Sequence, residues 1–335
     1  MKSFAFFRPP DPAAAVAAQA ESPTAQQGAS VRFLAGGTTL VDLMKLNVEG
    51  PQRLVDINRL PLDRIEQSPD GGLKIGATVR NSALAHHPAV LRDYAVLSQA
   101  ILAGASTQLR NRATTAGNLL QRTRCVYFRD TAMPCNKREP GTGCAAIEGH
   151  NRNLAILGTS THCIANNPSD MCVAMAALEA TIHVTGPKGA RSVPIADFHL
   201  LPGETPHKET VLEPGDLITH VSLPPSAPGS KSLYLKLRDR ASYEFALASA
   251  AVVIGVSDGK IARARVALGG VGAKPWRTRE IEAALEGQGA TEETFRRAAE
   301  AAVQGARPQT ENAFKVELAK RCLVHALKLA TQLPA

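Results

Sequence analysis

Four of the chain's six cysteines stand in one stretch of the sequence, where their thiolates could bind a metal together. They are Cys125, Cys135, Cys144 and Cys163. Four thiolates from one loop can hold a 4Fe–4S cluster or a tetrahedral zinc ion. The stretch has no Cys-x-x-Cys pair, which zinc sites usually use. Spacing alone leaves a cluster, zinc and unrelated free thiols equally open, and the missing secretion signal disfavours a disulfide framework.

The other two cysteines have apolar neighbours. Cys172 lies between Met171 and Val173, and Cys322 precedes Leu323. Both stand in segments with a helical pattern, so we expect them to be buried small hydrophobes.

Basic side chains gather around the four cysteines, while the chain as a whole has a net charge of +8 and a pI near 9.3. The local set comprises Arg110, Arg112, Arg122, Arg124, Arg129, Lys137 and Arg138, against the single acid Asp130. Nucleic-acid binding is disfavoured because the wider charge is scattered and lacks interleaved aromatics. The local set is either a solvated surface or a face toward an anion, such as a cofactor phosphate, a charged cluster or an acidic partner.

Two loops of small residues could approach a phosphate closely. The first consists of Ala35, Gly36, Gly37, Thr38, Thr39 and Leu40, and the second runs from Arg112 to Asn118. Glycine lets the backbone approach a ligand, and a helix N-terminus offers free N–H groups to an anion. Neither loop is a Rossmann G-x-G-x-x-G or a P-loop with its lysine. Together they fit a dinucleotide lying between two subdomains.

The elements that must position these loops alternate strand and helix patterns. The first third has expected strands at 3–7, 31–35, 53–57 and 73–77, and expected helices at 13–20, 38–46 and 95–103. Residues 123–162 show no period, so a long irregular segment is expected there. A helix is expected at 169–179, and strands at 180–185 and 216–223.

A stretch rich in Pro, Ser and Gly at 224–230 is the best domain boundary. Beyond it we expect strands at 232–237, 246–256 and 261–269, and helices at 278–285, 291–303 and 312–331. This order predicts a compact α+β domain, and no segment is apolar enough to span a membrane.

The ordered motifs resemble those of a known family. They are Leu34-Ala35-Gly36-Gly37-Thr38, Gln108-Leu109-Arg110-Asn111, Thr114-Thr115-Ala116-Gly117-Asn118, Pro168-Ser169-Asp170, Gly215-Asp216-Leu217-Ile218 and Tyr234-Leu235-Lys236. The set resembles the FAD-binding subunit of the xanthine dehydrogenase (molybdenum hydroxylase) family. Within that family it is most similar to the flavin/4Fe–4S subunit of bacterial heterotrimeric aldehyde oxidoreductases, over essentially the whole chain.

The resemblance implies an α+β architecture. A p-cresol methylhydroxylase-type two-subdomain FAD-binding fold would be followed by a C-terminal α+β domain. The first FAD-binding subdomain would comprise residues 1–57 and the second residues 58–225, with a cysteine-bearing insertion at about 121–165. The C-terminal flavoprotein domain would comprise residues 231–335.

The resemblance also implies the cofactor contacts. The first loop, Ala35–Leu40, would wrap the FAD pyrophosphate, and Thr115, Gly117 and Asn118 would hold the phosphate–ribose portion. Asp170 would contact FAD as well, with Leu217 near the adenine and Lys236 near the isoalloxazine. The family often has glycine where this chain has Ala116, which puts close backbone approach at that point in question.

The length of the cysteine stretch supports the resemblance to cluster-bearing members. Here 51 residues separate Asn118 from Asp170, whereas members without an extra cluster need roughly a dozen. Flavin subunits of the aldehyde oxidoreductase and hydroxybenzoyl-CoA reductase type carry a 4Fe–4S cluster in an insertion at this place. The resemblance thus favours Cys125, Cys135, Cys144 and Cys163 as cluster ligands, with neighbouring arginines and lysine offsetting its negative charge.

The function that the resemblance implies is electron transfer within a heterotrimer. A molybdenum-cofactor subunit would oxidise an aldehyde, and a 2Fe–2S subunit would pass the electrons to this chain's FAD. Reduced flavin would serve an external acceptor such as ferredoxin or oxygen. No residue of this chain is expected to be catalytic, since no Ser-His-Asp or paired-carboxylate group emerges.

Two alternatives stay open at this stage. One is a self-sufficient flavin oxidase or reductase of the same FAD fold, and the other is a zinc-stabilised assembly protein whose glycine loops are plain turns. We expect folding in the cytoplasm, with the periplasm as a possible destination if a partner carries a twin-arginine signal.

Overall fold

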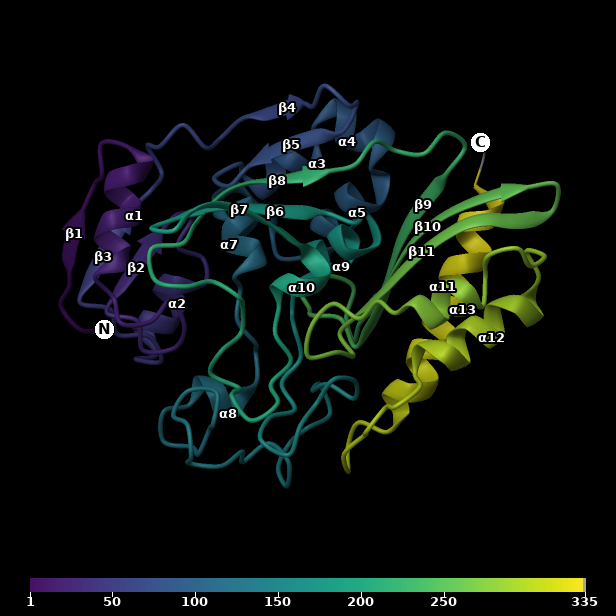
Figure 1. The fold of residues 1–335 in the computed structure, drawn as a ribbon. Coiled ribbons are helices and arrows are strands. Elements are labelled where there is room, and N and C mark those ends of the chain that lie inside the picture. Colours follow the sequence, from purple (N-terminus) through teal and green to yellow (C-terminus); the bar gives the residue numbers. More distant parts are fainter. Residues whose placement is uncertain (334–335) are drawn as a thin grey trace.

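Three separate β-sheets form the framework of the chain (Figure 1). The computed structural model describes residues 1–333, so residues 334 and 335 of the expected C-terminal domain lie outside the described part. None of the described helices is both long and apolar enough to cross a membrane.

The first sheet is parallel, with strand order β1-β3-β2. Its elements are β1 (Ala5–Phe7), α1 (Pro12–Ala20), β2 (Val31–Leu34), α2 (Leu40–Lys45) and β3 (Arg53–Asp56). Helix α1 begins where the sequence predicts, because Asp11 accepts a hydrogen bond from the N–H of Ala14 and Pro12 occupies the first turn. The turn from β2 into α2 carries the first glycine loop.

The second sheet is antiparallel, with strand order β4-β5-β8-β6-β7. Its strands are β4 (Ile65–Gln67), β5 (Leu73–Gly76), β6 (Thr181–Gly186), β7 (Gly189–Pro194) and β8 (Leu217–Leu223). Helices around it are α3 (Asn81–Ala85), α4 (Pro88–Asp93), α5 (Ala95–Ala103), α6 (Thr107–Arg112), α7 (Thr115–Leu119), α9 (Asp170–Ala177) and α10 (Ile195–Phe198). Leu97, Met175 and Val221 belong to the fully buried core between these helices and the sheet.

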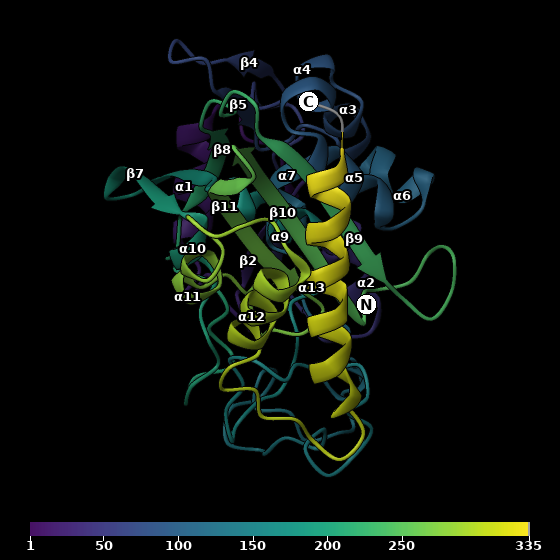
Figure 2. The ribbon, with the colours of Figure 1, turned by 90° about the vertical axis from the view of Figure 1, so that its right-hand side faces the viewer.

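The third sheet has the order β11-β10-β9 and carries the C-terminal helices on one face (Figure 2). Its elements are β9 (Lys231–Leu237), β10 (Ala248–Ser257), β11 (Lys260–Gly269), α11 (Arg279–Ala283), α12 (Glu292–Ala302) and α13 (Phe314–Gln332). Alternate residues of β10 face opposite ways: Val252 packs with Leu323 of α13, whereas Ala251 belongs to the core around α9. The predicted three-stranded sheet with helices is therefore confirmed.

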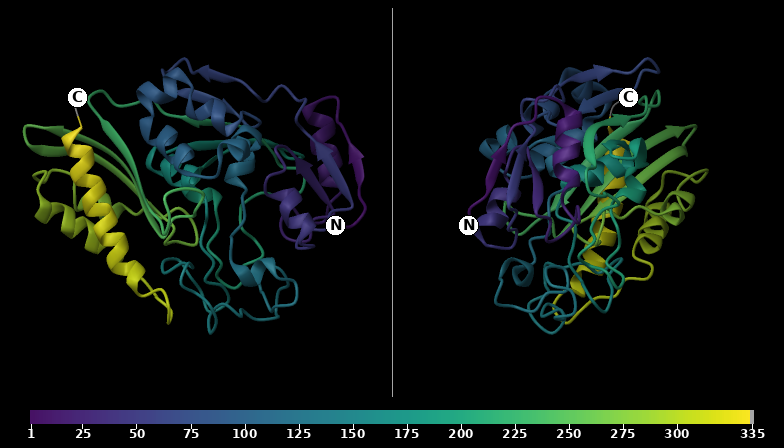
Figure 3. Two further views of the ribbon diagram at one scale, coloured as in Figure 1. Left: turned by 180° about the vertical axis from the view of Figure 1, so that it is seen from behind. Right: turned by 60° about the vertical axis from the view of Figure 1, so that its left-hand side comes forward.

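The cysteine segment, residues 121–165, forms a lobe at one end of the molecule (Figure 3). Its only helix is the single turn α8 (Val126–Arg129), so the prediction of a long irregular segment is nearly right. Asn151, which is fully buried, anchors this lobe to the C-terminal domain. Its side chain donates to the carbonyl of Gly149 and accepts from the N–H of Glu311, just before α13.

Two histidines stack on neighbouring strands of the second sheet. The rings of His183 (β6) and His220 (β8) lie 4.1 Å apart and nearly parallel, and Ser222 Oγ lies 2.8 Å from His183 Nε2. Burial, and then His183 and Lys74, lower the pKa of His220 to about 4. Both rings are therefore neutral near pH 7.

We expect this histidine pair to weaken the fold in acid. The unfolded chain binds a proton near pH 6.5 but the folded chain only near pH 4, so stability is full above pH 6.5 and is lost as the pH falls toward 4. The loss should be about 1–2 kcal/mol, since the pair is partly solvated. Urea unfolding at pH 7.5 and 4.5 measures it, and His220→Gln should flatten the dependence. An unchanged pH dependence in the variant would contradict this account.

Candidate functional site

The first glycine loop, Ala35–Leu40, passes very close to the backbone after α6. A Cβ atom at Gly36 would lie 2.1 Å from the carbonyl oxygen of Arg112. Gly37 has a φ of 76°, which favours glycine. Both glycines are therefore required by geometry, one by contact and one by backbone conformation.

The second small-residue segment is a helix start rather than an open loop. Arg112 ends α6, and Thr114 caps α7 by accepting a hydrogen bond from the N–H of Gly117. The N–H of Ala116 donates to the carbonyl of Ala77, and its methyl group belongs to the buried core. Alanine is accommodated here because its side chain packs inward.

Two cavities meet where these segments converge. Cavity A, of about 220 Å³, is lined by Ala35, Gly36, Gly37, Thr38, Thr39, Leu40, Gly117 and Leu217, among others. Cavity B, of about 250 Å³, is lined by Thr38, Thr39, Gly117, Asn118, Asp170 and Lys236, among others. Residues Thr38, Thr39 and Gly117 line both, so the two cavities adjoin at the paired loops.

One of the twelve predicted cofactor residues lies behind this lining. Thr115 is fully buried, and its hydroxyl donates to the carbonyl of Val79 at 3.2 Å. It holds the start of α7 in place instead of facing either cavity.

A buried ion pair stands at the wall of cavity B. Lys236 Nζ lies 2.8 Å from Asp170 Oδ2, and the Tyr234 hydroxyl donates to Asp170 Oδ1 at 2.5 Å. The side chains of Lys236 and Asp170 are only 4% and 10% exposed. Burial, together with the charge of Asp170, raises the pKa of Tyr234 well above its ordinary value. Tyr234 is therefore a permanent hydrogen-bond donor, and the carboxylate is held on two sides.

Buried polar atoms without a partner among the described residues occur in both linings. Asn81 Oδ1 belongs to a residue of cavity B, and His199 Nδ1 to a residue of cavity A, whereas His199 Nε2 is paired with the carbonyl of Leu119. Unsatisfied buried groups of this kind are costly and point to a missing polar ligand or water. Neither residue stands in a recognisable sequence motif, because a lone Asn or His carries no local pattern.

The four cysteines of the insertion lie together in one small core. They share it with Phe128 and Ile164, among others. Cys135 and Cys144 face each other in an isolated β-bridge, and the N–H of Ala165 donates to Cys163 Sγ at 3.5 Å. Burial raises the pKa of Cys125 to about 12. Within residues 1–333, no three metal-ligating side chains are grouped tightly enough for a single ion.

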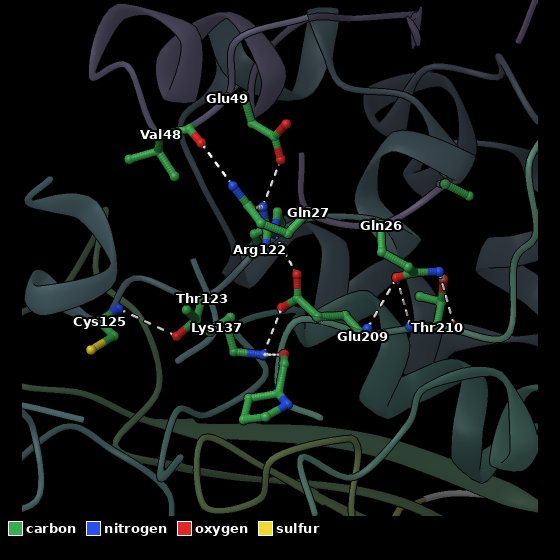
Figure 4. Close-up of polar contacts among 12 residues, drawn as sticks. Gln26, Gln27, Val48, Glu49, Arg122, Thr123, Cys125, Lys137, Glu209 and Thr210 are labelled. Atoms are coloured by element: carbon green, nitrogen blue, oxygen red, sulfur yellow. Dashed lines mark hydrogen bonds and ion pairs between the residues drawn. The ribbon is translucent and has the colours of Figure 1, made fainter. Parts of the chain in front are cut away.

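Carboxylates from distant parts of the chain neutralise most of the basic set. Arg122 pairs with Glu49 at 2.6 Å and with Glu209, and Lys137 pairs with Glu209 at 3.0 Å (Figure 4). Arg124 and Arg129 both pair with Asp42. In the fold, the single acid of this stretch is therefore joined by carboxylates from distant positions, so part of the basic set is paired within the chain.

Arg138 donates to the carbonyls of Tyr127 and Phe128, so it braces the turn of α8. Cys172 and Cys322, predicted to be buried hydrophobes, are 0% and 1% exposed, which confirms that prediction.

Comparison with known proteins identifies the class. Residues 2–226 match the family described as the FAD binding domain in molybdopterin dehydrogenase, and residues 232–330 match the CO dehydrogenase flavoprotein C-terminal domain. The chain belongs to the FAD-binding subunits of the molybdenum hydroxylase family, which are parts of oxidoreductases.

Individual relatives are similar over nearly their whole length. The chain is 53% identical to the aldehyde oxidoreductase FAD-binding subunit PaoB of Escherichia coli (strain K12), covering 98% of each chain. It is 27% identical to the carbon monoxide dehydrogenase medium chain of Hydrogenophaga pseudoflava, covering 91% of each. A solved structure of that carbon monoxide dehydrogenase superposes with a TM-score of 0.76 and covers 98% of each chain. The predicted family and fold are thus confirmed.

Proposed function

We propose that the chain is the FAD and 4Fe–4S electron-transfer subunit of a molybdenum-containing aldehyde oxidoreductase. The observation that carries the proposal is the pair of adjoining cavities at the two small-residue segments. The 53% identity to an aldehyde oxidoreductase FAD-binding subunit supports the aldehyde as substrate class. When bound, FAD and the cluster would supply two-electron and one-electron redox chemistry.

The chain's own residues would hold FAD across both cavities. The backbone of Gly36 and Gly37 would approach the pyrophosphate, and Leu217 would pack against the adenine in cavity A. Gly117 and Asn118 would hold the phosphate–ribose portion where the cavities adjoin. Lys236 would lie near the isoalloxazine in cavity B, and Asp170 beside it would contact FAD as well. Thr115 would act indirectly, by fixing α7. The unpartnered Asn81 and His199 atoms fit a ligand rich in hydrogen-bonding groups.

We assign a 4Fe–4S cluster, rather than a zinc ion, to the cysteine core. A cubane spreads its four thiolates over four irons, whereas one zinc ion needs them at a single tetrahedral centre. The four cysteines share one small core, where four thiolates could ligate a cluster together. A backbone N–H directed at Cys163 Sγ is typical of the hydrogen bonds that tune cluster potentials. Cys125, Cys135, Cys144 and Cys163 would be the ligands.

The expected division of the chain follows the three sheets. We include in the proposal a first FAD-binding subdomain at 1–57, a second at 58–225 with the insertion, and a C-terminal domain from 231. Partner subunits with the molybdenum cofactor and 2Fe–2S centres would deliver electrons. An external acceptor such as ferredoxin or oxygen would receive them.

Cysteine substitutions test the cluster assignment. We expect Cys135→Ser combined with Cys163→Ser to lower iron and acid-labile sulfide from about four each per chain to below about one, since a cubane needs its thiolates. The matched control is Cys322→Ser, a buried cysteine of α13 outside the core, which should keep its iron. Protein purified without oxygen that contains zinc or no metal would contradict the cluster, while bound FAD would still support the flavin part.

A further inference from the structure

A buried ion-pair network lies in the wall of cavity A and includes two residues of the cysteine segment. Its five members, here called the Arg122 network, are Arg32, Glu49, Arg122, Lys137 and Glu209, and all five line cavity A. Figure 4 shows Glu49, Arg122, Lys137 and Glu209. Glu49 is bound by Arg32 at 2.9 Å and by Arg122 at 2.6 Å. Glu209 joins Arg122 to Lys137, whose Nζ also donates to the carbonyl of Pro206 at 3.0 Å.

The network is not neutral by itself. Three cations face two carboxylates, and no side chain among the five is more than 25% exposed. An excess charge taken out of water is costly unless a counter-charge completes the group. Because all five residues line cavity A, an anionic ligand in that cavity is the counter-charge that the network lacks.

The same network reaches the cysteine segment at two points. Lys137 follows Asn136, whose Oδ1 accepts from the N–H groups of Gly141 and Gly143 and whose Nδ2 donates to the carbonyl of His162. Asn136 thus joins the turn between Cys135 and Cys144 to the residue before Cys163. The Arg122 guanidinium also stacks on the ring of Phe128, 4.5 Å from its centroid, within the cysteine core.

We infer that the Arg122 network couples binding of the adenosine-diphosphate half of FAD in cavity A to ordering of the cysteine segment. The inference rests on the proposed FAD binding. An anion in cavity A completes the charge of the network, fixes Lys137 and thereby tightens the turn that carries Cys135 and Cys144. By linkage, an ordered cysteine segment strengthens FAD binding by the same factor.

Hydrogen exchange on the full-length chain, stripped of flavin and metal, tests the coupling. Residues 138–164 line neither cavity, so any protection there is indirect. Saturating FAD, or ADP, should slow amide exchange across 138–164 about five- to tenfold, within the usual range of coupling between sites. FMN, which lacks the adenosine half, should leave amide exchange across 138–164 unchanged.

Lys137→Met is the decisive variant. It leaves two cations facing two carboxylates, so the remaining network is balanced and the chain should fold. FAD should bind more weakly by the same coupling factor, and at saturating FAD the protection of 138–164 should disappear. The matched control is Arg152→Met, an exposed arginine of the same segment paired with Asp239, which should keep the protection.

Three results would overturn the coupling. They are bound FAD with unchanged exchange at 138–164, equal protection by FMN, and full protection in Lys137→Met. Failure of the proposed function looks different, because flavin absorbance would then show no FAD bound, or metal analysis of the purified chain would show no iron.

Discussion

Gly36→Ala should weaken FAD binding at least about a hundredfold while the rest of the fold forms. The added Cβ would lie 2.1 Å from the carbonyl oxygen of Arg112 and 2.8 Å from its carbonyl carbon. Both are backbone atoms fixed by the end of α6, so the first glycine loop must move away from the start of α7. That movement opens the junction at which cavities A and B meet.

The measurement is a flavin titration of deflavinated protein, with thermal unfolding alongside. We expect a stability loss of about 1–3 kcal/mol from overpacking. The matched control is Gly50→Ala, because a Cβ there would meet only the Lys2 side chain at 3.7 Å. If Gly36→Ala bound FAD as tightly as Gly50→Ala, the paired loops would not be the cofactor site.

Lys236→Met should produce the largest loss of stability among the site variants, about 3–5 kcal/mol. Asp170 would keep the Tyr234 hydroxyl but lose the one cation that pairs with it in residues 1–333, which leaves a buried carboxylate uncompensated. The proposed flavin end of the site would also lose a positive charge, so the reduction potential of bound flavin should fall.

A double-mutant cycle separates pairing from packing. Lys236→Met combined with Asp170→Asn removes both charges, so it should be less destabilised than Lys236→Met alone. Chemical unfolding gives the free energies, and a redox titration gives the flavin potential. Equal destabilisation of the single and double variants would show that the two side chains contribute only by packing.

The sequence predicts the framework well where local patterns are strong. Helix α1 begins with an Asp cap and a proline. Strand β10 has a run of apolar residues that is long enough for the strand to be buried on both faces. Gly36 and Gly37 are informative because few other residues could replace them. Gly36 lies against the backbone of Arg112, and Gly37 has a positive φ. These features are local, so they can be recognised without tertiary information.

Several short elements have no clear sequence signal. Helices α3, α6 and α7 are too short for a helical period to show, and α7 was therefore expected as an open loop. The edge strand β7 has exposed, polar alternation with little apolar signal. Tertiary hydrogen bonds, such as the one from Thr115 to Val79, define these short elements.

The ion pairs of the site could not be predicted because they join distant positions. Arg122 lies 73 residues from Glu49 and 87 from Glu209 in the sequence, so no local motif indicates the pairing. The cysteine neighbourhood therefore looked strongly basic. In the fold, the carboxylates of Asp42, Glu49 and Glu209 pair with four of its seven basic side chains.

An anaerobic reductive titration of the purified chain tests the central claim, a flavin and a 4Fe–4S cluster in one electron-transfer subunit, most directly. Counting reducing equivalents while following flavin absorbance and the electron paramagnetic resonance signal separates the two centres. The account predicts about three electrons per chain, two taken up by FAD and one by the cluster. Uptake of about two electrons by flavin alone, with zinc or no metal present, would contradict it.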